Sequence, residues 1–152
     1  MSDKHLLSRR RVLEYGNGLL AIAMIPAPAL AAPTDADAAH QALFGDRAVT
    51  EGRVVLKVPP ISENGYSVPL SVEVDSPMTE DDHVVRIAIF SEENPLPDVA
   101  RFELGPRAGK ARIDTRIRLG NTQKIRAVAE MNDGALYGTS TFSIVTLAAC
   151  VL

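Results

Sequence analysis

Short apolar runs alternate with clusters of turn-forming residues along most of the chain, and this pattern predicts strands. The clusters are rich in proline, glycine, asparagine and aspartate, which favour turns for different conformational reasons. The predicted strands cover residues 53–58, 67–75, 83–91, 99–104, 110–119, 123–131 and 136–147. Seven strands at short, regular spacing predict an all-β fold, an antiparallel β-sandwich.

One short helix is predicted ahead of the strands, over residues 35–44. The stretch is rich in alanine, begins with acidic residues after Pro33, and stops at Gly45. The side chain of a threonine or aspartate accepts hydrogen bonds from the first free amides of a helix, so Thr34 or Asp35 is the expected N-cap.

The predicted strand at 110–119 shows the clearest alternation. Ile113, Ile117 and Leu119 fall on one face, and the other face carries Arg112, Asp114, Arg116 and Arg118. One face is therefore expected in the core and one in water. A mixed-charge strand face is ordinarily solvated, although its arginines leave open the docking of an anion or an acidic partner.

The first 31 residues have the pattern of a twin-arginine export signal. Arginines at 9–11 precede an apolar stretch at 16–25, and the small-x-small pattern of a cleavage site follows at 29–31. The apolar stretch is too short for a membrane span, and prolines would interrupt the alternative, an anchoring helix. We expect a signal peptide over 1–31, a sandwich over 32–145, a tail over 146–152 and a periplasmic location without membrane insertion.

Without that leader, the chain keeps 12 basic and 17 acidic residues. Phosphate binding requires a concentrated positive surface, so this balance argues against a nucleic-acid partner. The remaining length fits one domain with a modest core.

Cys150 is the only cysteine of the chain and lies close to its C-terminus. An unpaired cysteine in an exported protein either bonds another chain or stays free for chemistry. If residues 146–152 left the body as an extended tail, they would carry the thiol about 20 Å toward another protein. The alternative is a cysteine packed in an unbroken last strand, where it would share the face of Phe142 and Ile144 and be buried.

Other chemistry finds little support in the sequence. No Gly-x-Ser-x-Gly motif of a serine hydrolase is present, and nothing places His40 or His83 beside Cys150. Asp81, Asp82 and His83 are adjacent on a strand entry, where side chains diverge, so a solvated turn is favoured over a metal site. We therefore expect no catalytic residue, metal or cofactor.

Four stretches, at 64–69, 74–79, 89–100 and 127–134, resemble characteristic segments of the SoxY family, in the same order. The most specific parts are Asn94-Pro95-Leu96-Pro97 and Asp75-Ser76-Pro77-Met78. SoxY is the sulfur-carrying subunit of periplasmic thiosulfate-oxidising systems. The resemblance extends over nearly the whole mature chain, and a twin-arginine leader is usual for the family.

The resemblance implies an immunoglobulin-like sandwich that pairs with a SoxZ-type sandwich and carries a covalent sulfur adduct on Cys150. It implies no enzyme activity of the chain itself. Partner enzymes would act on the adduct: a c-type cytochrome complex that conjugates thiosulfate oxidatively, a hydrolase that releases sulfate, and in some systems a sulfane dehydrogenase.

The tail departs from the family pattern. The family ends in Gly-Gly-Cys-Gly-Gly, whereas the matching positions here are Ala148, Ala149, Cys150, Val151 and Leu152. Glycines make such a tail thin, while a β-branched valine and a leucine make it bulky and stiff. A divergent interaction module, which binds a SoxZ-type partner without carrying substrate, is the alternative function.

Overall fold

The structure, a computed structural model, describes residues 34–149. The predicted signal peptide and the residues Cys150, Val151 and Leu152 lie outside the described residues. Within the described part, no helix is long and apolar enough to cross a membrane.

The predicted helix is confirmed as α2, which spans Asp35–Phe44. Thr34 is its N-cap: the Thr34 hydroxyl accepts a hydrogen bond from the Asp37 amide at 3.2 Å, and the Asp37 carboxylate accepts one from the Thr34 amide at 3.1 Å. Such a reciprocal capping box satisfies two amides that the first helical turn leaves free. Gly45 ends the helix at a φ of +67°, a left-handed conformation that favours glycine.

All seven predicted strands are present, and two short strands join them. The strands are β1 (Val49–Glu51), β2 (Val54–Lys57), β3 (Ile61–Ser62), β4 (Val68–Val74), β5 (Val84–Ser91), β6 (Asp98–Glu103), β7 (Arg112–Ile117), β8 (Gln123–Met131) and β9 (Leu136–Val145). A 3-10 turn, η1 (Pro106–Ala108), lies between β6 and β7. The added strands β1 and β3 are too short to produce a readable alternation in the sequence.

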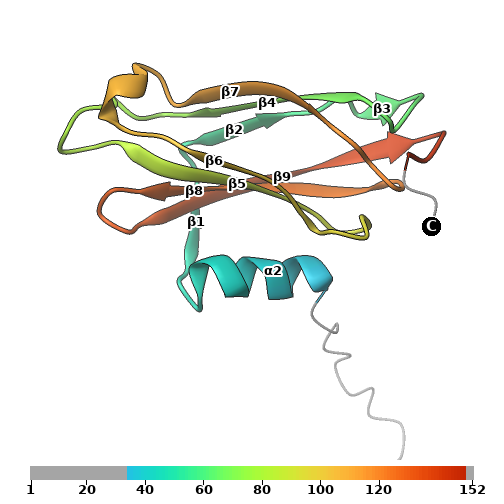
Figure 1. Ribbon diagram of the computed structural model, residues 1–152, viewed down its shortest axis with the longest axis horizontal. Coiled ribbons are helices and arrows are strands. Elements are labelled where there is room, and N and C mark those ends of the chain that lie inside the picture. The colour runs from blue at the N-terminus through green and yellow to red at the C-terminus, as the bar shows by residue number, and fades with distance from the viewer. Residues whose placement is uncertain (1–33, 150–152) are drawn as a thin grey trace, which may run out of the picture. The chain divides into compact units, whose positions relative to one another are not determined.

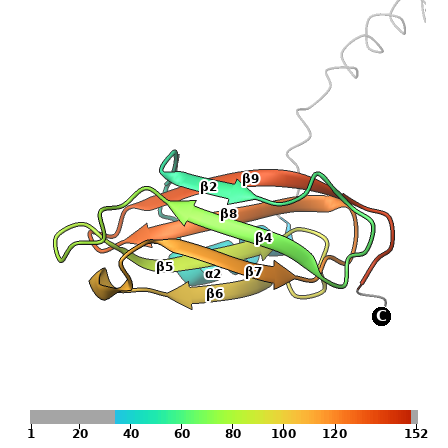
Figure 2. The ribbon, with the colours of Figure 1, turned by 90° about the horizontal axis from the view of Figure 1, so that it is seen from above.

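The strands form two stacked sheets (Figures 1 and 2). The larger sheet has the order β1-β9-β8-β5-β6, with β3 also paired to β9, and the smaller sheet has the order β2-β4-β7. Pairing is antiparallel except that β1 and β3 run parallel to β9. The predicted antiparallel sandwich is confirmed, and the parallel pairs involve only the added strands β1 and β3, between which β2 crosses to the smaller sheet.

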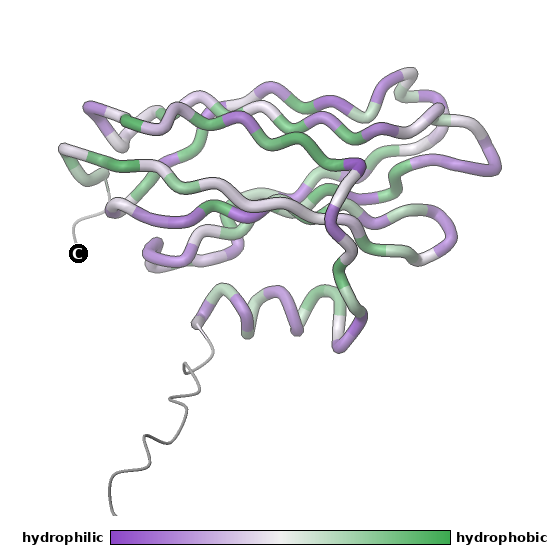
Figure 3. The backbone as a smooth tube through the Cα atoms, turned by 180° about the vertical axis from the view of Figure 1, so that it is seen from behind, coloured by the Kyte–Doolittle hydropathy of each residue, from purple (hydrophilic) through white to green (hydrophobic). Residues whose placement is uncertain are grey.

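The main core lies between the sheets and follows the period of two along each strand. On β4, the side chains of Val68, Leu70, Val72 and Val74 are buried, and on β8 those of Ile125, Ala127 and Ala129. Figure 3 shows the resulting change between hydrophilic and hydrophobic positions along the chain. The predicted alternation on β7 is confirmed, because Ile117 and the following Leu119 are buried while its charged residues are exposed.

Helix α2 covers the outer face of the larger sheet, on the side away from the smaller sheet (Figure 1). A second buried cluster joins Ala36, Phe44, Ala88, Phe90, Val128 and Leu136. The central strands β5 and β8 are thus buried on both faces, which explains their long apolar runs.

The end of β9 corrects one expectation. The strand ends at Val145 instead of reaching residue 147. Phe142 and Ile144 are 57% and 44% exposed, whereas Ser143 is fully buried. The buried serine is satisfied because its hydroxyl donates a 2.7 Å hydrogen bond to the Pro59 carbonyl. The predicted burial of the Phe142 face is therefore wrong, and a longer strand would have pointed that face toward water.

Candidate functional site

The described part of the tail, Thr146–Ala149, lies across two loops at one end of the sandwich. The Thr146 amide donates to the Ser62 carbonyl at 3.1 Å, and its hydroxyl donates to the Glu63 carbonyl at 2.9 Å. The Gly65 amide donates to the Leu147 carbonyl at 2.8 Å. These residues do not leave the body as an extended tether, as the 20 Å reach would require.

The last described contact of the tail is the closest to the candidate thiol. The Ala149 amide donates to the Leu119 carbonyl at 3.1 Å, and the Leu119 amide in turn donates to the Gly65 carbonyl at 2.9 Å. Ala148 and Ala149 are half-buried. Cys150 follows directly in the sequence and lies outside the described residues, so the structure places the base of the candidate site but not its thiol.

A buried polar cluster supports the loop that holds Ala149. Gln123 is only 2% exposed, and its side-chain amide donates to Asn94 Oδ1 at 3.0 Å and to the Asn121 carbonyl at 3.1 Å. Asn94 Oδ1 also accepts from the Gly120 amide at 2.7 Å. The Asn94-Pro95-Leu96-Pro97 stretch therefore has a structural partner, the loop after β7 that carries Leu119.

Gln123 also fixes the start of the loop after β5. Its Oε1 accepts hydrogen bonds from the Ser91 hydroxyl and, at 2.8 Å, from the Glu93 amide. The cluster fills the hydrogen-bonding capacity of a buried side-chain amide, which makes this end of the sandwich rigid.

Exposed apolar side chains gather near the same end. Strand β3 places Ile61 beside Ile144 on β9, and both are exposed, as are Phe142 and Leu147. Contiguous exposed apolar side chains mark interaction surfaces more often than isolated ones do.

Two arginines on the exposed face of β7 are held by neighbouring residues. Arg112 pairs with Asp114 at 2.8 Å and with Glu73 at 3.5 Å, and hydrogen bonding to Arg112 lowers the pKa of Asp114. Arg116 donates to the Ser67 hydroxyl at 2.6 Å and to the Ser67 carbonyl at 3.0 Å. These contacts favour the solvated-face interpretation over a concentrated anion site.

His40 belongs to the packing of α2. Its ring lies 5.2 Å from that of Phe44 and 5.6 Å from that of Phe90, and burial lowers its pKa, with a further contribution from the Arg126 charge. A cavity of about 570 Å³ beside it is also lined by Lys124 and Arg126. Arg126 pairs with acidic groups on both sides, Asp37 at 2.9 Å and Glu92 at 3.3 Å, so the cavity is not a strong anion site.

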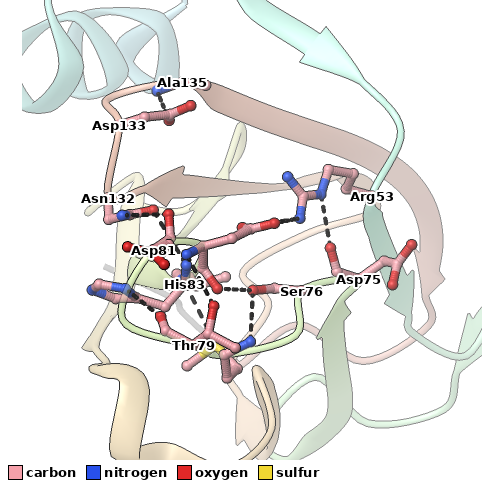
Figure 4. Close-up of polar contacts among 12 residues, drawn as sticks. Arg53, Asp75, Ser76, Thr79, Asp81, His83, Asn132, Asp133 and Ala135 are labelled. Atoms are coloured by element: carbon pink, nitrogen blue, oxygen red, sulfur yellow. Dashed lines mark hydrogen bonds and ion pairs between the residues drawn. The ribbon is translucent and has the colours of Figure 1, made fainter.

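Asp81, Asp82 and His83 lie in the loop before β5, which is at the end of the sandwich opposite the tail (Figure 1). Figure 4 shows the polar contacts around Asp81 and His83. Asp82 accepts two hydrogen bonds from the Arg53 guanidinium, at 3.1 and 3.2 Å. The His83 Nδ1 atom is 2.9 Å from the Thr79 carbonyl. The Asp82 and His83 side chains thus have different partners, and the Asp81 carbonyl accepts a hydrogen bond from the Asn132 side-chain amide at 3.0 Å.

The Asp75-Ser76-Pro77-Met78 stretch belongs to the same distant loop. The Arg53 guanidinium donates to the Asp75 carbonyl at 2.7 Å (Figure 4), and the Ser76 hydroxyl accepts from the Met78 amide at 3.2 Å. Met78 is 5% exposed at a φ of +52° and plugs the end of the core. The two most specific motifs therefore close opposite ends of the sandwich.

The sequence analysis missed two residues of this site, Gly65 and Gln123. Gly65 has the signal of an ordinary Asn-Gly turn, and only the folded chain shows that the tail crosses it. Gln123 is the first residue of β8, and the alternation of that strand places its side chain in the core. A polar residue at a core position was the signal in the sequence that could have identified it.

Comparison with known proteins gives a consistent result. The family model described as "Sulfur oxidation protein SoxY" matches residues 40–150. The structure of the sulfur carrier protein SoxY from Chlorobium limicola f thiosulfatophilum matches with a TM-score of 0.61 and 32% identity, over 73% of this chain and 96% of that chain. No curated protein matched the sequence.

More distant structures share the fold alone. Superoxide reductase (neelaredoxin) from Ignicoccus hospitalis matches with a TM-score of 0.55 and 14% identity, over 62% of this chain and 80% of that chain. Superoxide reductase from Nanoarchaeum equitans matches with a TM-score of 0.53 and 13% identity, over 62% and 99%. The fold is an immunoglobulin-like sandwich, the family-like stretches occur in the family's order, and the family model matches up to the lone cysteine. The chain therefore belongs to the SoxY family of sulfur oxidation proteins.

Proposed function

We propose that the protein is a periplasmic sulfur carrier, exported by the twin-arginine pathway, that holds thiosulfate-derived sulfur covalently on Cys150. The observation that carries the proposal is the family match, which ends at residue 150, on the only cysteine of the chain. That cysteine follows immediately after Ala149, whose amide is hydrogen-bonded to the Leu119 carbonyl of the sandwich.

The chemistry on the carrier needs only a thiol from this chain. A thiolate is a good sulfur nucleophile and forms reversible persulfide-type adducts. Cys150 and thiosulfate would form a cysteine S-thiosulfonate, releasing one proton and two electrons to a c-type cytochrome complex. Water would then release sulfate and a proton, leaving a cysteine persulfide, whose outer sulfur a sulfane dehydrogenase would oxidise.

A sandwich partner of SoxZ type completes the proposal. The exposed apolar side chains of Ile61, Phe142 and Ile144 support a docking role for this end of the larger sheet. In this arrangement the chain is a scaffold, and the catalytic groups belong to the partner enzymes that act on its adduct.

The tail composition favours a second function, a SoxY-like interaction module that binds its partner without carrying substrate. Ala148, Ala149, Val151 and Leu152 occupy the positions where the family has glycine. A narrow enzyme channel that admits glycines would meet side chains at all four positions.

The two proposed functions predict different masses for the mature protein. The mature protein is purified from the periplasm of cells oxidising thiosulfate, and its intact mass is measured with and without a thiol reductant. A reductant-sensitive mass increase that maps to Cys150, and is lost in Cys150→Ser, supports the carrier. An unmodified thiol in such cells supports the interaction module instead.

A further inference from the structure

Three segments far apart in the sequence meet in one backbone cluster, and we propose that Gly65 positions Cys150 through it. We call the contacts of Gly65 and Leu119 with Leu147 and Ala149 the tail clasp. The inference rests on the proposed carrier function, because it concerns how that carrier presents its thiol.

The clasp is a short ladder of main-chain hydrogen bonds. Gly65 donates to Leu147 at 2.8 Å and accepts from Leu119 at 2.9 Å, while Leu119 accepts from Ala149 at 3.1 Å. Each loop residue thus uses one backbone group for the other loop and one for the tail. The tail cannot leave without exposing donors and acceptors on both loops, which must then bond to water.

Gly65 allows these three segments of the backbone to approach one another closely. A Cβ atom at this position would lie 2.3 Å from the Leu119 carbonyl oxygen, and 3.1 Å from both the Leu147 oxygen and the Ala149 nitrogen. Gly65 does not have a positive φ, so its conformation alone does not require glycine. The lack of a side chain at Gly65 therefore allows the Leu119 loop and the tail to pack directly against its backbone. Two of the three atoms that a Cβ would crowd, Leu147 O and Ala149 N, belong to the tail.

The clasp determines how far along the tail the chain is held to the sandwich. With the clasp closed, Ala149 is fixed and Cys150 lies one Cα–Cα step of about 3.8 Å beyond it. With the clasp open, residues 146–152 could extend roughly 20 Å. The carrier therefore presents its sulfur at the rim made by the Gly65 and Leu119 loops, and partner enzymes must dock against that rim to reach it.

The test compares two variants that open the clasp with two that preserve it. Gly65→Ala introduces the crowded Cβ, and Gly105→Ala is its control, because Gly105 has a φ of −147° and open space around its Cβ position. Ala149→Pro removes the amide that donates to Leu119, and Ala149→Gly is its control, because glycine retains that amide.

Two measurements report the clasp directly. Amide hydrogen exchange is followed at Gly65 and Leu119, and a nitroxide spin label is attached to Cys150, the only cysteine. Opening is expected to accelerate exchange at Gly65 by about tenfold or more, and to increase the mobility of the label. The controls should keep the wild-type exchange and mobility, and melting temperatures show which variants remain folded.

The proposal is overturned if folded Gly65→Ala behaves like Gly105→Ala, or if Ala149→Pro leaves both readouts at the wild-type values. Should Gly65→Ala fail to fold, the Ala149 pair decides the question alone. Sulfur loading of Cys150, measured by mass, tests the carrier function separately. If Cys150 of the wild type carries sulfur but the Gly65 amide exchanges without protection, the clasp proposal is wrong and the carrier proposal stands. If the Gly65 amide is protected but Cys150 never carries sulfur, the carrier proposal is wrong and the clasp stands.

Discussion

Gln123 shows how a single polar side chain organises the end of the sandwich that carries the tail. It occupies an inward position at the start of β8 and is almost fully buried. Its amide binds the loop after β5 and the loop after β7 at the same time. Because Leu119 in the second loop holds Ala149, Gln123 supports the loop that binds the residue before the candidate cysteine.

Gln123→Ala is expected to destabilise the fold by about 1–3 kcal/mol, because it leaves the buried Ser91 hydroxyl and the Glu93 amide without their acceptor. Urea denaturation measures the change in the free energy of unfolding. Gln41→Ala is the matched control: Gln41 makes an exposed 2.7 Å hydrogen bond to Asp46, and its loss should cost less than about 0.5 kcal/mol. Equal effects of the two substitutions would contradict the structural role given to Gln123.

At the scale of elements, different sequence signals predict the helix α2 and the strands of the sandwich. The helix was predictable to its ends because Thr34 and Gly45 are specific caps. Most strands were predictable from their apolar alternation. The end of β9 was misread because its pattern is inverted, with Ser143 inside and Phe142 outside. The inward serine is tolerated through its bond to Pro59, a contact that periodicity alone does not reveal.

The contact between α2 and the larger sheet should weaken on acidification. Burial lowers the pKa of His40, and the charges of Arg126 and Arg47 act in the same direction, against the opposing effect of Asp37. The unfolded chain therefore takes up a proton at a higher pH than the folded protein does. As pH falls below about 6.5, the ordinary histidine value, the folded state loses stability relative to the unfolded state.

The free energy of unfolding of the wild type and of His40→Phe, measured by urea denaturation at pH 7.5 and pH 5.5, isolates this contribution. Phenylalanine retains an aromatic contact with Phe44 and Phe90 but does not titrate. We expect the wild type to lose more stability than the variant between the two pH values. An identical loss in both proteins would show that His40 does not contribute to the acid sensitivity.

At the scale of the whole molecule, the two ends of the sandwich are closed by different loops. The Asp75-Ser76-Pro77-Met78 loop closes one end of the core, and the Gly65 and Leu119 loops hold the tail at the other (Figure 1). The family and the sandwich could be inferred from the sequence segments and their order, whereas the role of Cys150 stays a prediction. The tail clasp could not, because it consists of main-chain bonds between residues about 30 to 85 positions apart, which leave no side-chain pattern.

The composition of the tail should limit how well partner enzymes accept this carrier. Replacing Ala148, Ala149, Val151 and Leu152 with glycine is expected to raise the rate of thiosulfate-dependent reduction of the c-type cytochrome complex of a SoxY system by about tenfold, because a few methyl groups in a tight channel change rates by that order. The replacement keeps the backbone amide at position 149 that donates to Leu119, so the clasp is preserved while the tail becomes both thinner and less stiff.

The same four substitutions combined with Cys150→Ser provide the control, since any rate that survives the loss of the thiol does not pass through the carrier. A rate that stays equal with both tails, while Cys150 remains necessary, would mean that the partner channels accommodate alanine, valine and leucine as easily as glycine. In that case the tail would not restrict the carrier, and its departure from the family pattern would no longer favour the interaction module.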